Sequence, residues 1–154
     1  MEVGSIIYRI VPDIDLICAG YLHDVVEDAK IPLLSIAQNF GENTAKYVEM
    51  MTDNKGLGWD ERKRLKREKL RICNDRNFAI LYYADTLSNL LSMARDYSQV
   101  GEKIWENFNQ KNSLEQYKHF HGVYAILGEV YGFNKDIFGW TEYNNALNAI
   151  FSEV

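Results

Sequence analysis

Four ionisable side chains gather within six residues at the end of an otherwise apolar segment, Ile17 to Asp28. A helix from about Ile14 to Ala29 turns by about 100° per residue, which directs all four into one sector and leaves apolar side chains in the other directions. The four are His23, Asp24, Glu27 and Asp28. Burying a histidine and three carboxylates costs several kcal/mol without compensation. A bound metal ion is the simplest compensation.

A second interpretation of this segment stays open at this point. An amphipathic helix often ends in a solvated acidic turn, and a histidine beside an aspartate is often an ordinary hydrogen-bonded pair. Another polar cluster elsewhere in the chain, able to face the first, favours the metal site over the solvated turn.

Composition indicates one soluble intracellular domain covering residues 1–154, because 154 residues with 47% hydrophobic side chains suffice for a true core. A net charge of −5 argues against binding DNA, RNA or an anionic membrane, which all require a basic face. No apolar run reaches the ~18 to 20 residues that span a bilayer, and the N-terminus lacks a basic region followed by a hydrophobic run. Cys18 and Cys73 lie in apolar patterns, as expected of reduced cysteines in the cytoplasm.

The order of apolar residues predicts an all-α bundle, because helical periodicity recurs along the chain and no useful run of alternating β-branched residues appears. Asp13 is the expected N-cap of the first polar helix. Trp140 and Phe151, near the C-terminus, offer a surface for a homo-oligomer. The expected helices are Val3 to Ile10, Ile14 to Ala29, Pro32 to Phe40, Glu42 to Thr52, a basic helix that opens at Trp59, Asn77 to Tyr97, Asn112 to Tyr131 and Thr141 to Phe151.

The helix from Asn77 to Tyr97 carries the second polar cluster. Its polar sector contains Asp85, Ser88, Asn89 and Ser92, while leucines point elsewhere. A solvent-facing strip is the preferred interpretation for the serines. It fits Asp85 less well, because no lysine or arginine lies within a turn to act as its partner.

Together the two clusters suit a divalent ion. His23, Asp24 and Asp85 offer one imidazole and two carboxylates, a set appropriate for Mn²⁺, Mg²⁺, Fe²⁺ or Zn²⁺. Glu27, one turn past His23, is placed to take a proton from a water that the ion activates, and such a set hydrolyses phosphoesters. A shared ion requires the Asp85 carboxylate to lie within ~10 Å of the His23 ring.

These residues also carry a family resemblance. The order and spacing of several motifs resemble the HD-domain hydrolases, in the branch that contains the hydrolase domain of RelA/SpoT-type enzymes and their small single-domain relatives. The resemblance runs from about Val3 to Leu127. The motifs are His23-Asp-Val-Val-Glu-Asp28, Phe40-Gly-Glu42, Val48 to Lys55, Trp59-Asp-Glu-Arg-Lys63, Tyr83-Ala-Asp-Thr-Leu-Ser-Asn-Leu90, Trp105 to Asn109 and Glu115-Gln-Tyr117.

The resemblance implies an all-helical bundle that binds a divalent metal, commonly Mn²⁺, and removes pyrophosphate from the 3′ position of guanosine tetra- or pentaphosphate. It implies a role for each matching residue. His23, Asp24 and Asp85 would be metal ligands, Glu27 and Asp28 would handle the attacking water, and Asn89 would lie near the sugar or the metal. Lys55, Arg62 and Lys63 would face the phosphates, with a solvated basic helix as the alternative.

One departure leaves the activity open. The first metal-binding histidine of the family would fall just upstream of Met1, while His119 and His121 lie in a late helix and are expected to pack on neighbouring aromatic rings. The protein begins further upstream, or it has a weaker three-ligand site, or it has lost the chemistry. Two hypotheses follow: a metal-dependent phosphohydrolase, and a non-catalytic module that binds a nucleotide or a metal.

Overall fold

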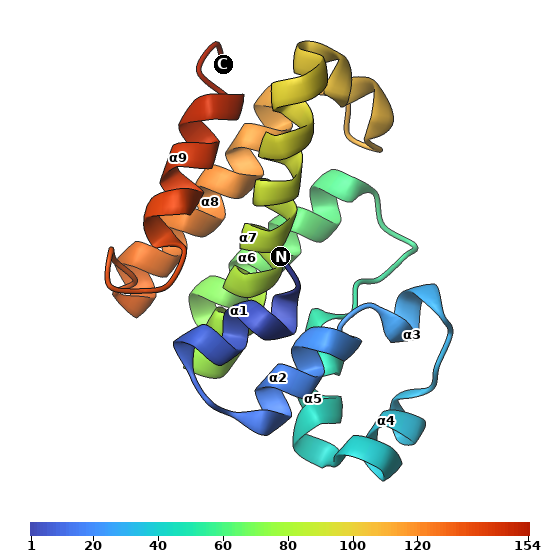
Figure 1. The fold of residues 1–154 in the computed structure, drawn as a ribbon. Coiled ribbons are helices and arrows are strands. Elements are labelled where there is room, and N and C mark those ends of the chain that lie inside the picture. The colour runs from blue at the N-terminus through green and yellow to red at the C-terminus, as the bar shows by residue number, and fades with distance from the viewer.

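The computed structural model describes all residues from Met1 to Val154, and it is entirely helical (Figure 1). This confirms the predicted all-α fold. The bounds of most elements agree with the sequence expectation to within one or two residues. The elements are α1 (Val3–Ile10), α2 (Ile14–Leu22), α3 (Val25–Asp28), α4 (Leu33–Phe40), α5 (Glu42–Met51), α6 (Trp59–Ile72), α7 (Arg76–Val100), the 3₁₀ helix η1 (Gly101–Asn107), α8 (Ser113–Tyr131) and α9 (Trp140–Ile150).

Helix α7 is the axis of the fold. It runs through the middle of the molecule and packs against α1, α2 and α5 at one end and against α8, α9 and η1 along the rest (Figure 1). Asp75 caps its start by accepting the backbone N–H groups of Asn77 and Phe78. Leu81, Leu87 and Leu90 are fully buried on this helix, and each contributes about 1.5–3 kcal/mol by leaving water. The element that carries Asp85 is therefore rigidly held.

The first polar helix is not continuous, which corrects the predicted span from Ile14 to Ala29. Asp13 caps it as expected, with its carboxylate 2.9 Å from the Leu16 nitrogen, but α2 ends at Leu22. His23 and Asp24 form a turn, and α3 follows as a single helical turn. The His23 ring bonds back to the carbonyl of Gly20 at this point. A constant 100° per residue therefore does not apply across the turn, and the directions of Glu27 and Asp28 need the structure.

Two glycines let α1 and α2 cross closely beneath this turn. A Cβ atom on Gly20 would lie 2.6 Å from the Ile7 Cδ1 atom and 3.1 Å from the backbone of Gly4. The end of the Ile7 side chain would therefore have to shift, and the Gly4 backbone would have to give by a few tenths of an ångström. The small residues that precede His23 thus fix its approach to α1 and α7.

We expect Gly20→Ala to lower the free energy of unfolding by about 1–3 kcal/mol, because the added methyl group overpacks the crossing. Gly128→Ala is the matched control. Its Cβ would meet only ordinary contacts at 3.8 Å inside α8, so alanine should stabilise the helix by about 0.5–1 kcal/mol. Urea denaturation measures both. A Gly20→Ala protein as stable as the wild type would contradict the close crossing.

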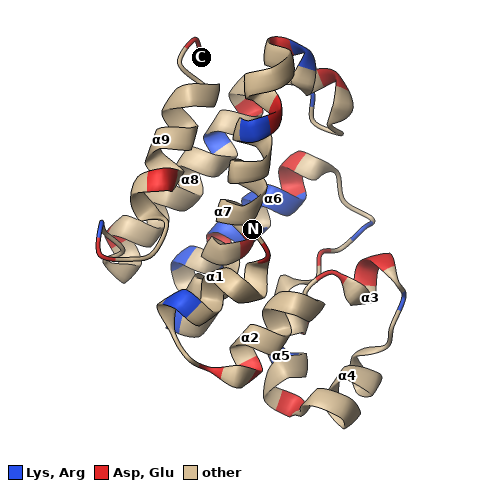
Figure 2. Ribbon diagram, viewed as in Figure 1, with Lys and Arg blue, Asp and Glu red and all other residues tan.

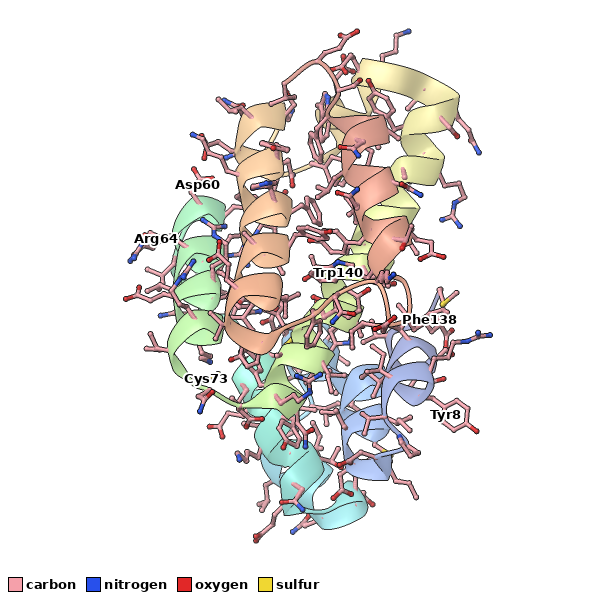
Figure 3. All side chains as sticks on the ribbon, turned by 90° about the vertical axis from the view of Figure 1, so that its left-hand side faces the viewer. Tyr8, Asp60, Arg64, Cys73, Phe138 and Trp140 are labelled. Atoms are coloured by element: carbon pink, nitrogen blue, oxygen red, sulfur yellow. The ribbon has the colours of Figure 1, made fainter.

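The C-terminal aromatic residues do not form the exposed surface expected for a homo-oligomer. Trp140 stacks on Tyr124 with ring centroids 4.1 Å apart, and Phe151 stacks on Trp105 at 5.5 Å. Both side chains are buried. Figure 3 shows Trp140 at the beginning of α9, where these rings join α8 and α9. Both rings therefore belong to the hydrophobic core of the protein.

Two further expectations concern the cysteines and membrane spans. Cys18 and Cys73 are both free, in agreement with the expectation of unpaired cysteines. None of the helices combines the length and the apolar character that crossing a bilayer requires.

Candidate active site

His23 is positioned by the turn that separates α2 from α3. Its Nδ1 atom lies 2.7 Å from the carbonyl oxygen of Gly20. A carbonyl only accepts, so Nδ1 carries the proton and Nε2 faces away from α2. The side chain is 15% exposed, at the wall of a cleft between this turn and α7. An outer hydrogen bond of this kind orients histidines that bind metals.

Both predicted carboxylates meet the Nε2 atom of His23. An oxygen of Asp24 lies 3.0 Å away and an oxygen of Asp85 on α7 lies 3.2 Å away. The separation is far inside the ~10 Å limit required for a shared ion. The amide of Asn89, one turn along α7, donates to the same Asp85 oxygen at 3.2 Å. The two polar clusters of the sequence therefore form one cluster in space.

Without a metal ion, the cluster is a charged hydrogen-bonded group. Burial lowers the pKa of His23, but the hydrogen bonds and charges of Asp24 and Asp85 outweigh burial and raise the pKa to about 10. The hydrogen bond from His23 in turn holds the pKa of Asp24 below its usual value. A divalent cation would take over the role of the imidazolium proton between these carboxylates.

The donor set fits a divalent ion. Two ligands at right angles, each about 2.1 Å from one ion, lie about 3 Å apart, which matches both nitrogen-to-oxygen separations. The structure nevertheless contains no group of three or more His, Cys, Asp or Glu side chains that is arranged to hold a metal ion. The Asp24 side chain is 62% exposed and therefore free to turn toward an ion that His23 and Asp85 contact. These three residues would hold the ion.

The cleft beside His23 has a volume of about 260 Å³ and is almost entirely polar. Of the two acidic residues predicted to handle water, Glu27 and Asp28, only one lines it. Glu27 lines it and accepts the backbone N–H of Asp53. Asp28 is exposed and does not line the cleft. Lys55 donates to the Glu27 carbonyl at 2.8 Å and also lies outside the lining, so it holds α3 against the loop after α5. A role for Asp28 in handling water stays a prediction.

Helix α6 presents its cations on two faces. Asp60 and Arg64 lie on the outer side (Figure 3), where Arg64 pairs with Glu61 and Glu68. Arg62 and Lys63 line the cleft. Figure 2 shows the basic residues on α6 and the acidic residues on α3 and in the segment that joins α5 to α6. Arg62 and Lys63 thus lie on the cleft side of α6, and their role toward phosphates stays a prediction.

Sequence reasoning missed two charged residues of this cleft. Lys66, 9% exposed, lies 2.6 Å from an Asp53 oxygen and donates to the Met51 carbonyl at 2.7 Å. Burial, followed by the charge of Lys66, lowers the pKa of Lys63, so the cations of α6 are crowded. The signal for Lys66 was present, since Trp59, Lys63 and Lys66 follow helical spacing on one face. Asp53 follows α5 in a loop, where periodicity gives no direction.

We expect Lys66→Met to lower the free energy of unfolding by about 2–4 kcal/mol, because it leaves the largely buried Asp53 carboxylate with only its 4.0 Å contact to Arg62. Lys69→Met is the matched control on the same helix. Lys69 is exposed and makes one hydrogen bond, to the Met50 carbonyl at 3.1 Å, so its loss should cost less than about 1 kcal/mol. Urea denaturation compares them. Equal effects for the two lysines would show that the pair with Asp53 is not special.

The two late histidines contact aromatic rings, as expected. His119 meets Trp59 edge to face at 5.7 Å, and His121 stacks on Tyr117 at 5.2 Å. Neither lines the cleft of His23. His119 lies instead in a second, adjoining pocket.

Comparison with known proteins gives three findings. The sequence pattern of the HD domain matches residues 1–114. The guanosine-3′,5′-bis(diphosphate) 3′-pyrophosphohydrolase MESH1 of Xenopus tropicalis is 35% identical over 123 residues, covering 72% of this chain and 68% of that protein. The human MESH1 protein is 35% identical over 105 residues, and the match covers 68% of this chain and 56% of the human protein. The chain thus spans between about half and two thirds of these two relatives.

Among solved structures, the crystal structure of lmo0812 from Listeria monocytogenes EGD-e superimposes with a TM-score of 0.85 at 30% sequence identity. It covers 99% of this chain and 97% of the Listeria chain. The likeness therefore extends over the whole bundle, including α8 and α9, which follow the region matched by the HD domain pattern.

Proposed function

This chain belongs to the HD domain family and is related to the 3′-pyrophosphohydrolases of guanosine-3′,5′-bis(diphosphate), and from this premise we propose that it is a metal-dependent phosphohydrolase. Its proposed substrate is a guanosine tetra- or pentaphosphate, or a related nucleotide, from which it removes the 3′ pyrophosphate. Mn²⁺ is the proposed ion, with Mg²⁺, Fe²⁺ and Zn²⁺ as alternatives.

One observation carries the proposal. The His23 imidazole, on the turn after α2, contacts the carboxylates of Asp24 and Asp85 within 3.2 Å at the wall of a polar cleft. Structural ion pairs of this kind are common, but here the cleft also contains three cations on α6 and a further carboxylate, Glu27. Ligands, cations and a proton acceptor in one cleft are the requirements for hydrolysing a phosphate ester.

Each residue of the cleft has a proposed role. His23, Asp24 and Asp85 hold the ion, which when bound supplies a Lewis acid for water and for a phosphoryl oxygen. Glu27 accepts the proton of the attacking water, whose oxygen bonds to phosphorus as the bond from phosphorus to the 3′ oxygen breaks. As it leaves, the 3′ oxygen takes up the proton that Glu27 accepted, so a 3′ hydroxyl forms and pyrophosphate is released. Asn89 orients Asp85 through its hydrogen bond and borders the sugar.

The cations of α6 bind the pyrophosphate in this proposal. Arg62 and Lys63 line the cleft, and the Nε atom of Arg62 is buried without a hydrogen-bond partner. A buried guanidinium donor without a partner is costly, and a phosphate oxygen would satisfy it. An anion would also relieve the repulsion between Lys63 and its neighbours. Lys55 acts indirectly by holding α3.

Pyrophosphate release from a panel of 3′- and 5′-phosphorylated nucleotides tests the function. The protein is first stripped of metal with a chelator and then supplied with Mn²⁺, Mg²⁺, Fe²⁺ or Zn²⁺. We expect release from guanosine 3′-pyrophosphates only after metal is added. Release that persists in excess chelator would contradict the metal mechanism, and no release from any nucleotide would leave a binding module.

A further inference from the structure

A second pocket adjoins the cleft of His23 and differs from it in chemistry. It measures about 230 Å³ and shares Trp59, Lys63, Asp85 and Asn89 with the cleft. Its other walls come from α7, α8 and the segment after η1, and they include Phe108, Phe120 and Met93. The first cleft is almost entirely polar and contains the three cations of α6 beside its carboxylates, whereas this pocket combines aromatic rings with polar side chains. A phosphate suits the first and a planar heterocycle suits the second.

One residue that lines this pocket has a buried hydroxyl group without a partner. Tyr82 is 1% exposed, and its Oη atom makes no hydrogen bond in the protein. Burial raises the pKa of Tyr82 well above its usual value, so the group stays a neutral O–H donor. Buried hydroxyl groups nearly always have partners, and leaving one unpaired costs free energy. A ligand acceptor in the pocket would satisfy it.

A second donor borders the same pocket. The Nδ1 atom of His119 lies 3.1 Å from Nη1 of Arg67. Because a guanidinium only donates, Nδ1 must accept, and the proton of the neutral ring resides on Nε2. Burial, together with the nearby cations Lys63, Arg67 and Lys66, lowers the pKa of His119 and keeps the ring neutral. The pocket therefore offers an O–H and an N–H donor of fixed protonation.

We propose that this pocket binds the nucleobase and that Tyr82 and His119 select a 6-oxopurine by donating to its acceptor edge. The inference rests on the proposed function and adds the residues that determine specificity. Guanine and hypoxanthine present two acceptors, O6 and N7, on this edge, whereas adenine replaces O6 with an amino donor. An amino group facing two donors leaves the buried hydroxyl unpaired, so adenine is disfavoured.

Equilibrium binding of three nucleotides tests the proposal without requiring turnover. Titration calorimetry measures guanosine, inosine and adenosine 5′-diphosphates on the full chain and on Tyr82→Phe. We expect the wild type to bind the guanosine and inosine compounds about tenfold more tightly than adenosine diphosphate. Tyr82→Phe should weaken the first two by about five- to tenfold, the usual effect of one lost hydrogen bond, and change the third by less than twofold. Inosine separates the 6-oxo contact from any contact with the 2-amino group of guanine.

The melting temperature distinguishes a ligand contact from a structural one. Tyr82→Phe removes an unpartnered hydroxyl, so the free protein should melt at the same or a higher temperature. Tyr83→Phe is the matched control, because the adjacent hydroxyl donates to the Phe138 carbonyl at 2.8 Å. Its loss should lower the melting temperature and leave the preference among the three nucleotides unchanged.

The outcomes separate this inference from the proposed function. Discrimination among the nucleotides without pyrophosphate release would support the base pocket and overturn the hydrolase. Hydrolysis with unchanged discrimination in Tyr82→Phe would overturn the role of Tyr82 and leave the hydrolase standing. No binding of any of the three diphosphates, or equal binding of all three by the wild type, would also overturn the base pocket.

Discussion

His23→Ala is expected to reduce Mn²⁺-dependent pyrophosphate release by at least about 10³-fold, because the ion supplies several kcal/mol of transition-state stabilisation. The alanine removes the only imidazole of the cluster and leaves Asp24 and Asp85 facing each other without the group that joins them. Metal content after gel filtration and initial rates of pyrophosphate release measure the two consequences. Both should fall together.

His121→Ala is the control for this experiment. His121 is exposed on α8 and stacks on Tyr117, away from the cleft. We expect the metal content of the His121→Ala protein and its rate of pyrophosphate release to match those of the wild type. Activity that survives His23→Ala would eliminate the proposed site, and loss of activity with full metal content would assign His23 to a step other than metal binding.

The meeting of His23 with Asp85 could be predicted from the sequence because Asp85 lies on a helix, and His23 directly follows one, whose other directions are apolar. Helix α7 is continuous over 25 residues, so the direction of Asp85 followed from periodicity, and the absence of a nearby cation marked it as a residue with a distant partner. Apolar burial on both helices then leaves few ways to orient them. The polar sectors have to face a common space, and the contact at 3.2 Å is the result.

The surroundings of that contact could not be predicted in the same way. Helix α2 ends at Leu22, and there the His23 ring bonds to the Gly20 carbonyl; the periodicity of the sequence reports neither. The turn there directs Glu27 into the cleft and leaves Asp28 outside the lining. Asp53 lies in a loop, where its place depends on the chain that precedes and follows it. The positions of such residues depend on tertiary contacts, whereas the local sequence pattern determines where the helices form.

In the basic helix α6, helical spacing shows which residues share a face, but it does not show which face points inward. Arg62 and Lys63 were identified as phosphate-facing candidates, with solvation as the alternative, and α6 has both an inner and an outer cationic face. The choice between faces depends on which side packs against α7 and α8, and the sequence of α6 alone contains too few apolar residues to decide it. Lys66 is buried on this helix because Asp53 pairs with it.

Glu27→Gln should lower kcat by about 10²–10⁴-fold, the usual contribution of a general base, while Mn²⁺ affinity stays within about threefold of the wild type. Metal affinity should be kept because the hydrogen bond between Glu27 and the loop after α5 survives the substitution. The Oε1 atom of Glu27 accepts the backbone N–H of Asp53, and a glutamine oxygen accepts the same bond, so α3 keeps its position. What glutamine cannot do is accept a proton from water at neutral pH.

Glu49→Gln removes the same charge from an exposed position on α5 outside the cleft and should leave kcat unchanged. Steady-state rates at saturating nucleotide, with metal affinity from titration calorimetry, separate the possible roles of Glu27. An unchanged kcat would pass the proton-accepting role to another group, with Asp28 as the first residue to examine. A large fall in metal affinity would instead make Glu27 a ligand, since a base that only accepts a proton contributes nothing to holding the ion.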